Sequence, residues 1–239
     1  MVCIHINFDL SHGLFIRRLN RFMALVDVGG ENVYAHLPNS GRLTTALYPG
    51  ARLYLRRCLS RGFRKSIYSA FASEYDDGVR VIVDAQFSNH LARETIERDL
   101  FNELADYRVV KENVKLEDSN VRLDFLLKSS SGRFYLEVKS VTHVVEGVAL
   151  FPDAPTSRGR RHILELTSLM KNGFNAGMIF SVQRPDAVAV KPNANVDPEF
   201  ADLLRAAVNN GLKIFSFTAV FEPPKTIRLK PNEPVFSLA

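Results

Sequence analysis

The stretch Val121-Arg-Leu-Asp-Phe-Leu-Leu-Lys-Ser-Ser-Ser-Gly-Arg-Phe-Tyr-Leu-Glu-Val-Lys-Ser-Val-Thr142 decides the fold of this chain. Two apolar runs rich in strand-forming residues flank a short polar linker, a pattern typical of a β-hairpin. A turn at residues 129–132 pairs residues whose numbers sum to 261, among them Asp124 and Glu137. Because side chains alternate along a strand, Glu137 and Lys139 share one face. We therefore expect three charged groups to cluster on one side of an otherwise apolar hairpin.

Charged groups among buried positions cost free energy unless they are paired or bind a metal. Asp124 and Glu137 can share a divalent cation, which polarises a phosphoryl oxygen and lowers the pKa of a bound water. Lys139 can then orient that water or balance the developing charge. The alternative is a plain ion pair, either Glu137 with Lys139 or Asp124 with Arg122. The pattern alone leaves the metal site and the ion pair equally open.

The composition indicates a globular protein with ample apolar content. The 239 residues carry a net charge of +5 and are 46% hydrophobic, which suits one large domain or two small ones. No stretch approaches the ~20 apolar residues that span a bilayer, and the N-terminus lacks a signal-peptide pattern. Cys3 and Cys58 are too few for a disulfide framework or a zinc site. We expect a cytoplasmic protein with no membrane partner.

Short strand-like runs separated by turn signals make up the N-terminal part of the chain. At least five such runs lie between residues 13 and 85 without a convincing long helix, which predicts a small β-barrel of the OB type. Such barrels commonly bind oligonucleotides across an exposed strand face. The segment from Arg52 to Lys65 holds six basic residues and no acid, which fits a polyanion partner or a solvated loop. The candidate phosphate contacts here are Arg42, Arg56, Arg57, Arg64 and Lys65.

Aromatic residues near these bases can stack on nucleobases, although aromatic residues at alternating strand positions are more often part of a core. The candidates are Tyr34, Tyr54, Phe63 and Tyr68.

From about residue 89 the pattern becomes that of an α/β domain. Helices are predicted at residues 90–104, 158–172 and 199–209, and strands at residues 177–182 and 214–221. A strand, a helix and a second strand in succession imply a right-handed crossover into a mixed sheet. Glu94 of the first helix can approach the hairpin or stay solvated. We predict an α+β protein with an OB-like barrel at residues 1–86 and an α/β domain at residues 87–239.

The helix that begins near residue 158 starts with Arg158-Gly-Arg-Arg-His162, after Thr156 or Ser157 as its cap. Basic residues at this end oppose the helix dipole, whereas free amides and the dipole favour anions. Arg158, Arg160 and Arg161 therefore indicate either a phosphate-docking helix end or a solvated basic turn.

Several motifs, in this order, resemble the sugar fermentation stimulation protein A (SfsA) family along nearly the whole chain. They are Leu37-Pro-Asn-Ser-Gly-Arg42, Asn89-His-Leu-Ala-Arg-Glu94, Arg122-Leu-Asp-Phe-Leu126, Leu136-Glu-Val-Lys-Ser-Val-Thr142 and Phe151-Pro-Asp-Ala-Pro-Thr-Ser-Arg-Gly159 with His162. The resemblance implies an N-terminal OB-like domain and a C-terminal domain similar to the PD-(D/E)XK, restriction-endonuclease-like nucleases. It implies that Asp124 is the first acid, Glu137 the second and Lys139 the lysine, while Glu94 matches a helix acid. Arg160 stands where such nucleases often carry glutamine or lysine.

Two functions stay open for a chain that resembles this DNA-binding family. In the first, Asp124 and Glu137, with Glu94 as a further ligand, hold Mg²⁺ or Mn²⁺ and the protein is a DNA nuclease. In the second, the protein is a non-catalytic, largely sequence-nonspecific DNA-binding regulator of sugar metabolism on a nuclease scaffold. An ion pair between Lys139 and Glu137 that leaves no room for an ion favours the second. A second copy of the chain, in a homodimer, is a further candidate partner.

Overall fold

The predicted hairpin forms in the larger of two sheets that organise the molecule. Its strands are β9 (Arg122–Ser129) and β10 (Gly132–Val141). Their antiparallel pairs run from the turn to Phe125 opposite Leu136, which confirms the predicted register. This computed structural model describes residues 2–58, 66–116 and 119–238.

The hairpin lies inside a seven-stranded sheet with the order β1-β16-β15-β13-β10-β9-β8. The other strands of this sheet are β1 (Val2–His5), β8 (Arg108–Lys115), β13 (Asn175–Val182), β15 (Lys213–Glu222) and β16 (Thr226–Pro231). Strands β10, β13 and β15 run parallel and are joined through helices, which confirms the predicted crossover. The parallel strands are buried on both faces, as the continuous apolar runs in their sequences require.

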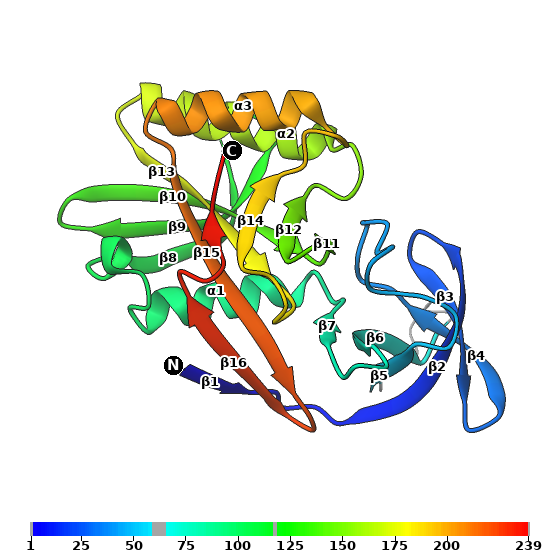
Figure 1. Cartoon of the computed structure of the whole chain (residues 1–239). Coiled ribbons are helices and arrows are strands. Elements are labelled where there is room, and N and C mark those ends of the chain that lie inside the picture. Colours follow the sequence, from blue (N-terminus) through cyan, green and yellow to red (C-terminus); the bar gives the residue numbers. More distant parts are fainter. Residues whose placement is uncertain (1, 59–65, 117–118, 239) are drawn as a thin grey trace.

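Helices cover both faces of this sheet (Figure 1). Leu91 and Ile96 of the first helix pack against Leu136 and Val138 on one face. The other two helices lie side by side and pack against the opposite face, where they cover Tyr135 and its neighbours. The helices are α1 (Phe87–Glu97), α2 (Ser157–Lys171) and α3 (Pro198–Asn209).

A six-stranded barrel forms the second part of the molecule, with the order β4-β3-β2-β5-β6-β7 and a closing pair between β4 and β6. Its interior holds small and branched apolar side chains, among them Val26, Ala35 and Leu53. This arrangement confirms the predicted OB-like barrel. The strands are β2 (Leu10–Asn20), β3 (Met23–Val28), β4 (Glu31–His36), β5 (Arg52–Arg57), β6 (Tyr68–Glu74) and β7 (Arg80–Ile82).

A small four-stranded sheet packs beside the larger one, in the order β11-β12-β14-β17. Its strands are β11 (Val144–Val145), β12 (Val148–Phe151), β14 (Ala189–Pro192) and β17 (Val235–Phe236). Strand β12 leads through residues 152–156 into α2, so the small sheet fixes where that helix begins.

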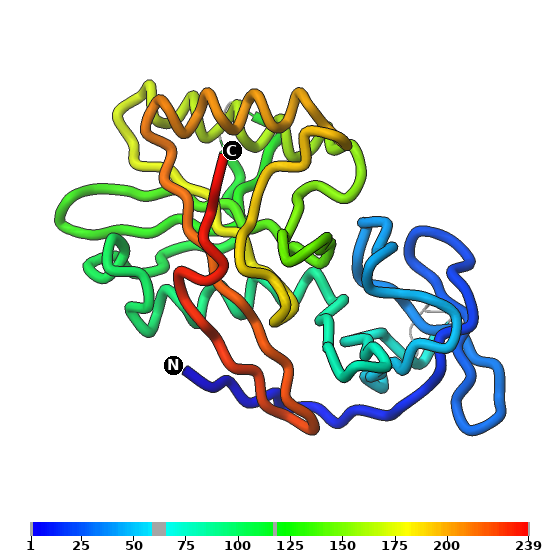
Figure 2. Tube along the Cα trace, in the orientation of Figure 1, coloured from blue at the N-terminus to red at the C-terminus, as the bar shows by residue number. Residues whose placement is uncertain are grey.

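The structure differs from the sequence-based expectation in several places. Residues Val2–His5, expected within the barrel domain, form β1 and pair with β16 in the larger sheet. The helix predicted at residues 90–104 ends at Glu97, because Asp99 takes a positive φ of 54° and a short 3₁₀ turn follows at Asn102–Leu104. Strand β8 was not predicted, since it is an exposed edge strand whose charged sequence has no apolar alternation. Figure 2 shows a further feature, the chain running from β1 beside β16 into the barrel.

The barrel and the larger sheet share packed and hydrogen-bonded contacts. Tyr54 and Phe71 of the barrel pack edge-on against Phe221 of β15. Arg184, which is only 5% exposed, donates to the Thr45 carbonyl of the barrel at 2.6 Å and to the Thr142 carbonyl of the sheet domain at 3.2 Å. Buried contacts of this kind fix the two parts against each other, because separating them would leave polar groups unpaired.

Arg18 of β2 holds the barrel loop that faces the sheet domain. Its guanidinium donates to the carbonyls of Gly41 at 2.7 Å, Arg42 at 2.8 Å and Asn39 at 3.2 Å. It also donates to the carbonyls of Arg21 at 2.5 Å and Asn20 at 3.1 Å. One planar group thus ties two turns of the barrel together, a task that its fork of donors suits.

We predict that Arg18→Lys lowers the free energy of unfolding by about 2 kcal/mol, because one ammonium cannot reach all five carbonyls. Urea unfolding monitored by circular dichroism measures the change. Arg17→Lys is the matched control, since the Arg17 side chain is exposed and makes no contact with a carbonyl in the described part of the chain. Equal losses in the two variants would contradict the role of Arg18.

Candidate functional site

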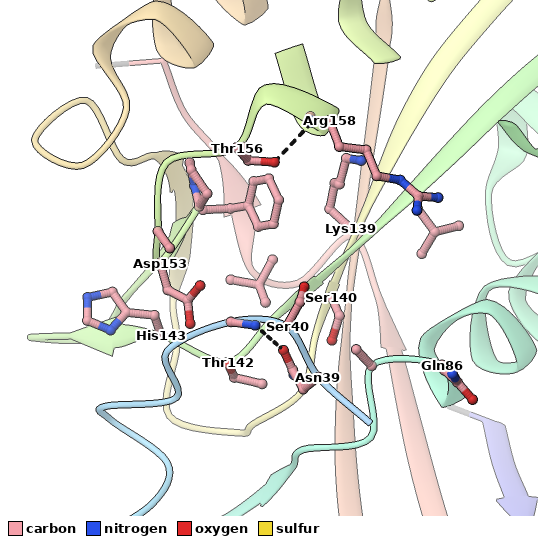
Figure 3. A pocket seen from close by; sticks show the side chains of 18 of the residues that line it. Asn39, Ser40, Gln86, Lys139, Ser140, Thr142, His143, Asp153, Thr156 and Arg158 are labelled. Atoms are coloured by element: carbon pink, nitrogen blue, oxygen red, sulfur yellow. Dashed lines mark hydrogen bonds between the residues drawn. The ribbon is translucent and has the colours of Figure 1, made fainter. Parts of the chain in front are cut away.

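A pocket of about 630 Å³ lies between the barrel and the sheet domain (Figure 3). The sheet domain contributes Asp124 of β9, strand β10 with Glu137 and Lys139, and the loop at residues 152–156. The barrel contributes the turn at Arg21 and Phe22 and the loop at residues 38–41. The pocket therefore needs both parts of the chain.

Asp124 lies on the pocket wall where β9 separates from β10. One carboxylate oxygen accepts a hydrogen bond from the Asn89 amide group of α1 at 2.7 Å, and the other accepts from the Val138 backbone amide at 2.8 Å. Burial, followed by repulsion from the Glu137 carboxylate, raises the pKa of Asp124 to about 7. A group with such a pKa is half protonated at neutral pH and gains from any cation beside it.

Glu137 is buried with one of its oxygens engaged and the other free. Its Oε1 accepts from Lys139 Nζ at 2.7 Å and contacts His162 Nδ1. Its Oε2 is buried and has no hydrogen-bond partner among the described residues. Burial alone would raise the pKa of Glu137, but Lys139 and His162 together hold it below its ordinary value. Glu137 is thus a charged carboxylate with an unused oxygen.

His162 of α2 completes this buried cluster. Its Nδ1 lies 3.2 Å from Lys139 Nζ, and its Nε2 accepts a hydrogen bond from Arg158 Nε at 3.3 Å. Burial lowers the pKa of His162 and so favours the neutral ring, in which Nε2 accepts from Arg158 and the Nδ1 hydrogen faces the Glu137 carboxylate. Arg158 and His162 are four residues apart, so one face of α2 presents both toward the site.

Local structure explains why these groups converge. The Thr156 hydroxyl caps α2 by accepting from the Gly159 amide at 2.9 Å, which fixes the start of the helix. A Cβ at Gly159 would lie 2.7 Å from the Thr156 side chain and 3.1 Å from Phe200, so only glycine fits there. Strand β10, α1 and α2 then supply one side chain or more each to the same point.

The three arginines predicted at the start of α2 have different surroundings. Arg158 lines the pocket. Arg160 pairs with Asp197 at 3.1 Å and Glu199 at 2.9 Å, and so joins α2 to the start of α3. Arg161 is exposed. The structure therefore brings one of the three arginines, Arg158, to the site. The arginine at position 160, where such nucleases often carry glutamine or lysine, pairs with two acids of the α3 start instead.

The predicted basic residues of the barrel are also spread out. Arg42 and Arg57 are exposed. Arg56 lies over the Phe8 ring at 5.0 Å and lines a second cavity of about 450 Å³. Arg64 and Lys65, with the aromatic Phe63, fall outside the described residues. Of the other aromatic candidates, Tyr54 is buried, Tyr68 packs against the barrel core and Tyr34 is 53% exposed.

Glu94 is not brought to the pocket. It faces the second cavity and pairs with Arg98 at 2.8 Å, one helical turn further along α1. The α1 residue that does reach the Asp124 carboxylate is Asn89, which belongs to the motif at residues 89–94 but had no predicted role. The roles of Asn89 and of the buried His162 are hard to predict from one sequence, because asparagine and histidine are both common on helix surfaces.

The donor set fits a divalent cation only in part. No cluster of three or more His, Cys, Asp or Glu side chains with metal-ligand geometry occurs among the described residues. The chemistry of the pair nevertheless suits one: the free Glu137 Oε2 and the destabilised Asp124 carboxylate are hard oxygen donors. Both line the same pocket, which leaves room for water as the remaining ligands.

Comparisons with known proteins show matches along most of the chain. Residues 16–83 match the model described as the SfsA N-terminal OB domain, and residues 86–225 match the sugar fermentation stimulation protein RE domain. The sugar fermentation stimulation protein homologue of Desulforamulus reducens is 39% identical over 227 residues, which cover 95% of this chain and 92% of the relative. That of Chloroflexus aurantiacus is 38% identical over 228 residues, covering 95% and 86%.

A solved structure, Pyrococcus furiosus SfsA in complex with Ca²⁺, matches the fold with a TM-score of 0.87. It is 30% identical, and the match covers 95% of this chain and 96% of that one. Among the described residues, no helix is both long and apolar enough to cross a membrane.

We predict that Asp124→Asn stabilises the metal-free protein more at pH 8 than at pH 5. The folded wild type keeps the Asp124 proton to about pH 7, whereas the unfolded chain loses it near 3.8, so wild-type stability falls as pH rises between these values. The variant lacks this loss, which amounts to about 2 to 3 kcal/mol between pH 5 and 8. Urea unfolding in EDTA at both pH values measures it, with exposed Asp106→Asn as control. A pH-independent difference would show that the Asp124 pKa is not raised.

Proposed function

The chain belongs to the sugar fermentation stimulation protein family, and we propose that it binds DNA and hydrolyses phosphodiester bonds with a divalent cation. The observation that carries this proposal is the pair of acids at one pocket wall, of which Glu137 is buried and Asp124 is half-buried. Asp124 has a raised pKa, and Glu137 has an oxygen without a hydrogen-bond partner in the described structure. A cation between them would both favour the ionised form of Asp124 and give the unpaired Glu137 oxygen a partner. The Pyrococcus furiosus relative, which was solved in complex with Ca²⁺, supports divalent-cation binding by the family.

Asp124 and Glu137 would hold the ion, with Mg²⁺ or Mn²⁺ as the expected metal. When bound, such an ion polarises a phosphoryl oxygen and acidifies a water molecule. The chain's own groups have separate tasks. Lys139, positioned by Glu137 and His162, places a positive charge at the pocket wall where charge develops on the phosphate. Asn89 and the Val138 amide keep Asp124 oriented.

The rim of the pocket suits a phosphate backbone. Arg158 stands at the wall formed by α2, and Arg21 stands at the wall formed by the barrel. The Arg21 side chain makes no ion pair with any described residue, so its charge is free for a ligand. Backbone contacts of this kind bind without reading the base sequence. A DNA substrate would place the protein in the cytoplasm, and a homodimer stays a prediction.

A second candidate is a DNA-binding protein without turnover, which the ion pair between Lys139 and Glu137 favours. At 2.7 Å, Lys139 already neutralises one Glu137 oxygen and so weakens the carboxylate as a ligand. This candidate predicts DNA binding that falls steeply with salt, with or without metal. In this candidate the buried Lys139–Glu137 ion pair only stabilises the fold, and the free Glu137 Oε2 has no function.

We expect the purified protein to cleave fluorescently labelled DNA in Mg²⁺ or Mn²⁺ and to lose at least 100-fold in rate in Glu137→Gln, because a neutral amide cannot balance the cation. Glu103→Gln is the matched control, since Glu103 is exposed and does not line the pocket. Calorimetric titration with Ca²⁺ gives a readout of metal binding that does not depend on turnover.

Cleavage that survives in Glu137→Gln would point to a contaminating nuclease and remove the proposal. Ca²⁺ binding lost in Glu137→Gln, with no cleavage by the wild type in either metal, would leave the non-catalytic DNA-binding protein. Wild-type binding that does not depend on salt would contradict both candidates, because contacts with phosphates release counterions.

A further inference from the structure

We propose that the substrate enters the pocket as an unpaired nucleic-acid strand, with bases stacked on Phe22 and Tyr34 of the barrel. The inference rests on the proposed function for the chemistry at Asp124 and Glu137, and it adds the class of substrate. The two aromatic side chains form, with Arg17, Arg21 and His36, a surface that we call the strand path.

The size and the rigidity of the pocket exclude an intact duplex from its interior. A volume of about 630 Å³ lies within the range that accommodates one small organic molecule, and so accommodates a nucleotide or two. The walls cannot simply move apart, because the Leu43 amide donates to Asp153 across the pocket at 3.1 Å and Arg184 donates to both parts. Because Glu137 is only 3% exposed, a phosphate must enter the pocket to reach it, which a single strand does more readily than the wide backbone of a duplex.

Phe22 stands at the pocket mouth as an exposed aromatic ring. It lines the pocket and is 48% exposed, although burial of a phenylalanine is strongly favoured. Its backbone is held in place, with its amide donating to Asn20 Oδ1 at 2.9 Å and its carbonyl accepting from the Leu37 amide at 2.9 Å. A rigid, exposed ring beside a site for phosphates is a stacking platform for a base.

The outer face of the barrel continues from this mouth. Met23 lies opposite His36 and Leu25 lies opposite Tyr34 in the pairing of β3 with β4. Because every second residue shares a face, Tyr34 stands on the side of the barrel that His36 presents to the pocket. Tyr34 is 53% exposed, so the aromatic surface does not end at the pocket.

The spacing along this face suits an unstacked strand. Tyr34 lies two residues from His36 along β4, which separates them by about 6.8 Å, and Phe22 directly precedes Met23, the partner of His36. Phe22 and Tyr34 are therefore separated by more than the ~3.4 Å rise per nucleotide of a duplex strand. Bases that stack on Phe22 and Tyr34 therefore cannot remain stacked on each other as in a duplex. The platform selects for a strand that is already open, such as a single-stranded tail.

The charges along the strand path fit a phosphate backbone. Arg17 lies opposite Leu25 in the row that contains Tyr34, and Arg21 lies beside Phe22. Both arginines are exposed and neither forms an ion pair within the described residues. Asp27 lies one row further along β3, opposite Asn32, so we end the path before that row.

The test measures binding in EDTA, by fluorescence anisotropy, of a labelled 12-nucleotide oligothymidylate and of a blunt DNA hairpin of similar length. We expect the wild type to bind the oligothymidylate more tightly than the hairpin. Phe22→Ala and Tyr34→Ala should each weaken oligothymidylate binding about tenfold and leave hairpin binding unchanged, since each base loses one stacking partner. Phe22→Trp should keep the affinity.

Leu164→Ala is the matched control, because Leu164 is 53% exposed on α2 and its loss removes a similar apolar surface away from the path. Equal affinity for the two probes, or unchanged oligothymidylate binding in both alanine variants, would overturn the strand path. The metal-free assay separates the two proposals. If the wild type prefers the oligothymidylate but cleaves no DNA when metal is added, the strand path stands and the nuclease proposal fails. If the Phe22→Ala variant still cleaves the blunt hairpin, and the cleavage depends on Glu137, the nuclease proposal stands and the strand path fails.

Discussion

The burial of the Glu137 carboxylate is the constraint on which the site depends. A charged carboxylate in the protein interior is tolerated only with partners, and the structure supplies them from different elements: Lys139 from the same strand and His162 from α2. Because each partner must be in place before the charge is stabilised, the ends of β10 and α2 have little freedom. The same reasoning applies to Glu137 Oε2, which is buried without a hydrogen-bond partner among the described residues. Leaving it unpaired costs free energy that a bound ligand can recover.

The second determinant is the contact between the barrel and the sheet domain. Gly41 permits it directly, since a Cβ at this residue would lie 2.5 Å from the Asp153 carboxylate. Asp153 in turn accepts from the Leu43 amide, while Arg18 holds the carbonyls around the same loop. The pocket thus has one wall from an OB-like barrel and another from the domain that carries the acids. The cavity therefore combines the acids of the sheet domain with the outer surface of the barrel.

Much of the fold follows from local patterns, whereas the site follows only in part. The hairpin register was predictable because period-2 alternation and one turn determine it, and the crossover was predictable because buried parallel strands are continuous apolar runs. Strand β8 was missed because an exposed edge has no apolar face, and the early end of α1 depends on one positive φ at Asp99. The approach of Asn89 to Asp124 and the removal of Glu94 to another cavity depend on how α1 is rotated on the sheet. That rotation is a property of tertiary packing.

The pairing of β1 with β16 makes the barrel an insertion rather than an N-terminal appendage. The chain leaves the larger sheet after β1, builds the barrel and returns at α1, so two covalent connections anchor the barrel to its neighbour. A module on a single linker can swing through a wide range of orientations, whereas one anchored at both ends loses most of that rotational entropy before any contact forms. The insertion topology therefore presets the distance between the barrel and the acids of the sheet domain. A barrel excised at residue 87 would take β1 with it and leave β16 as an open sheet edge.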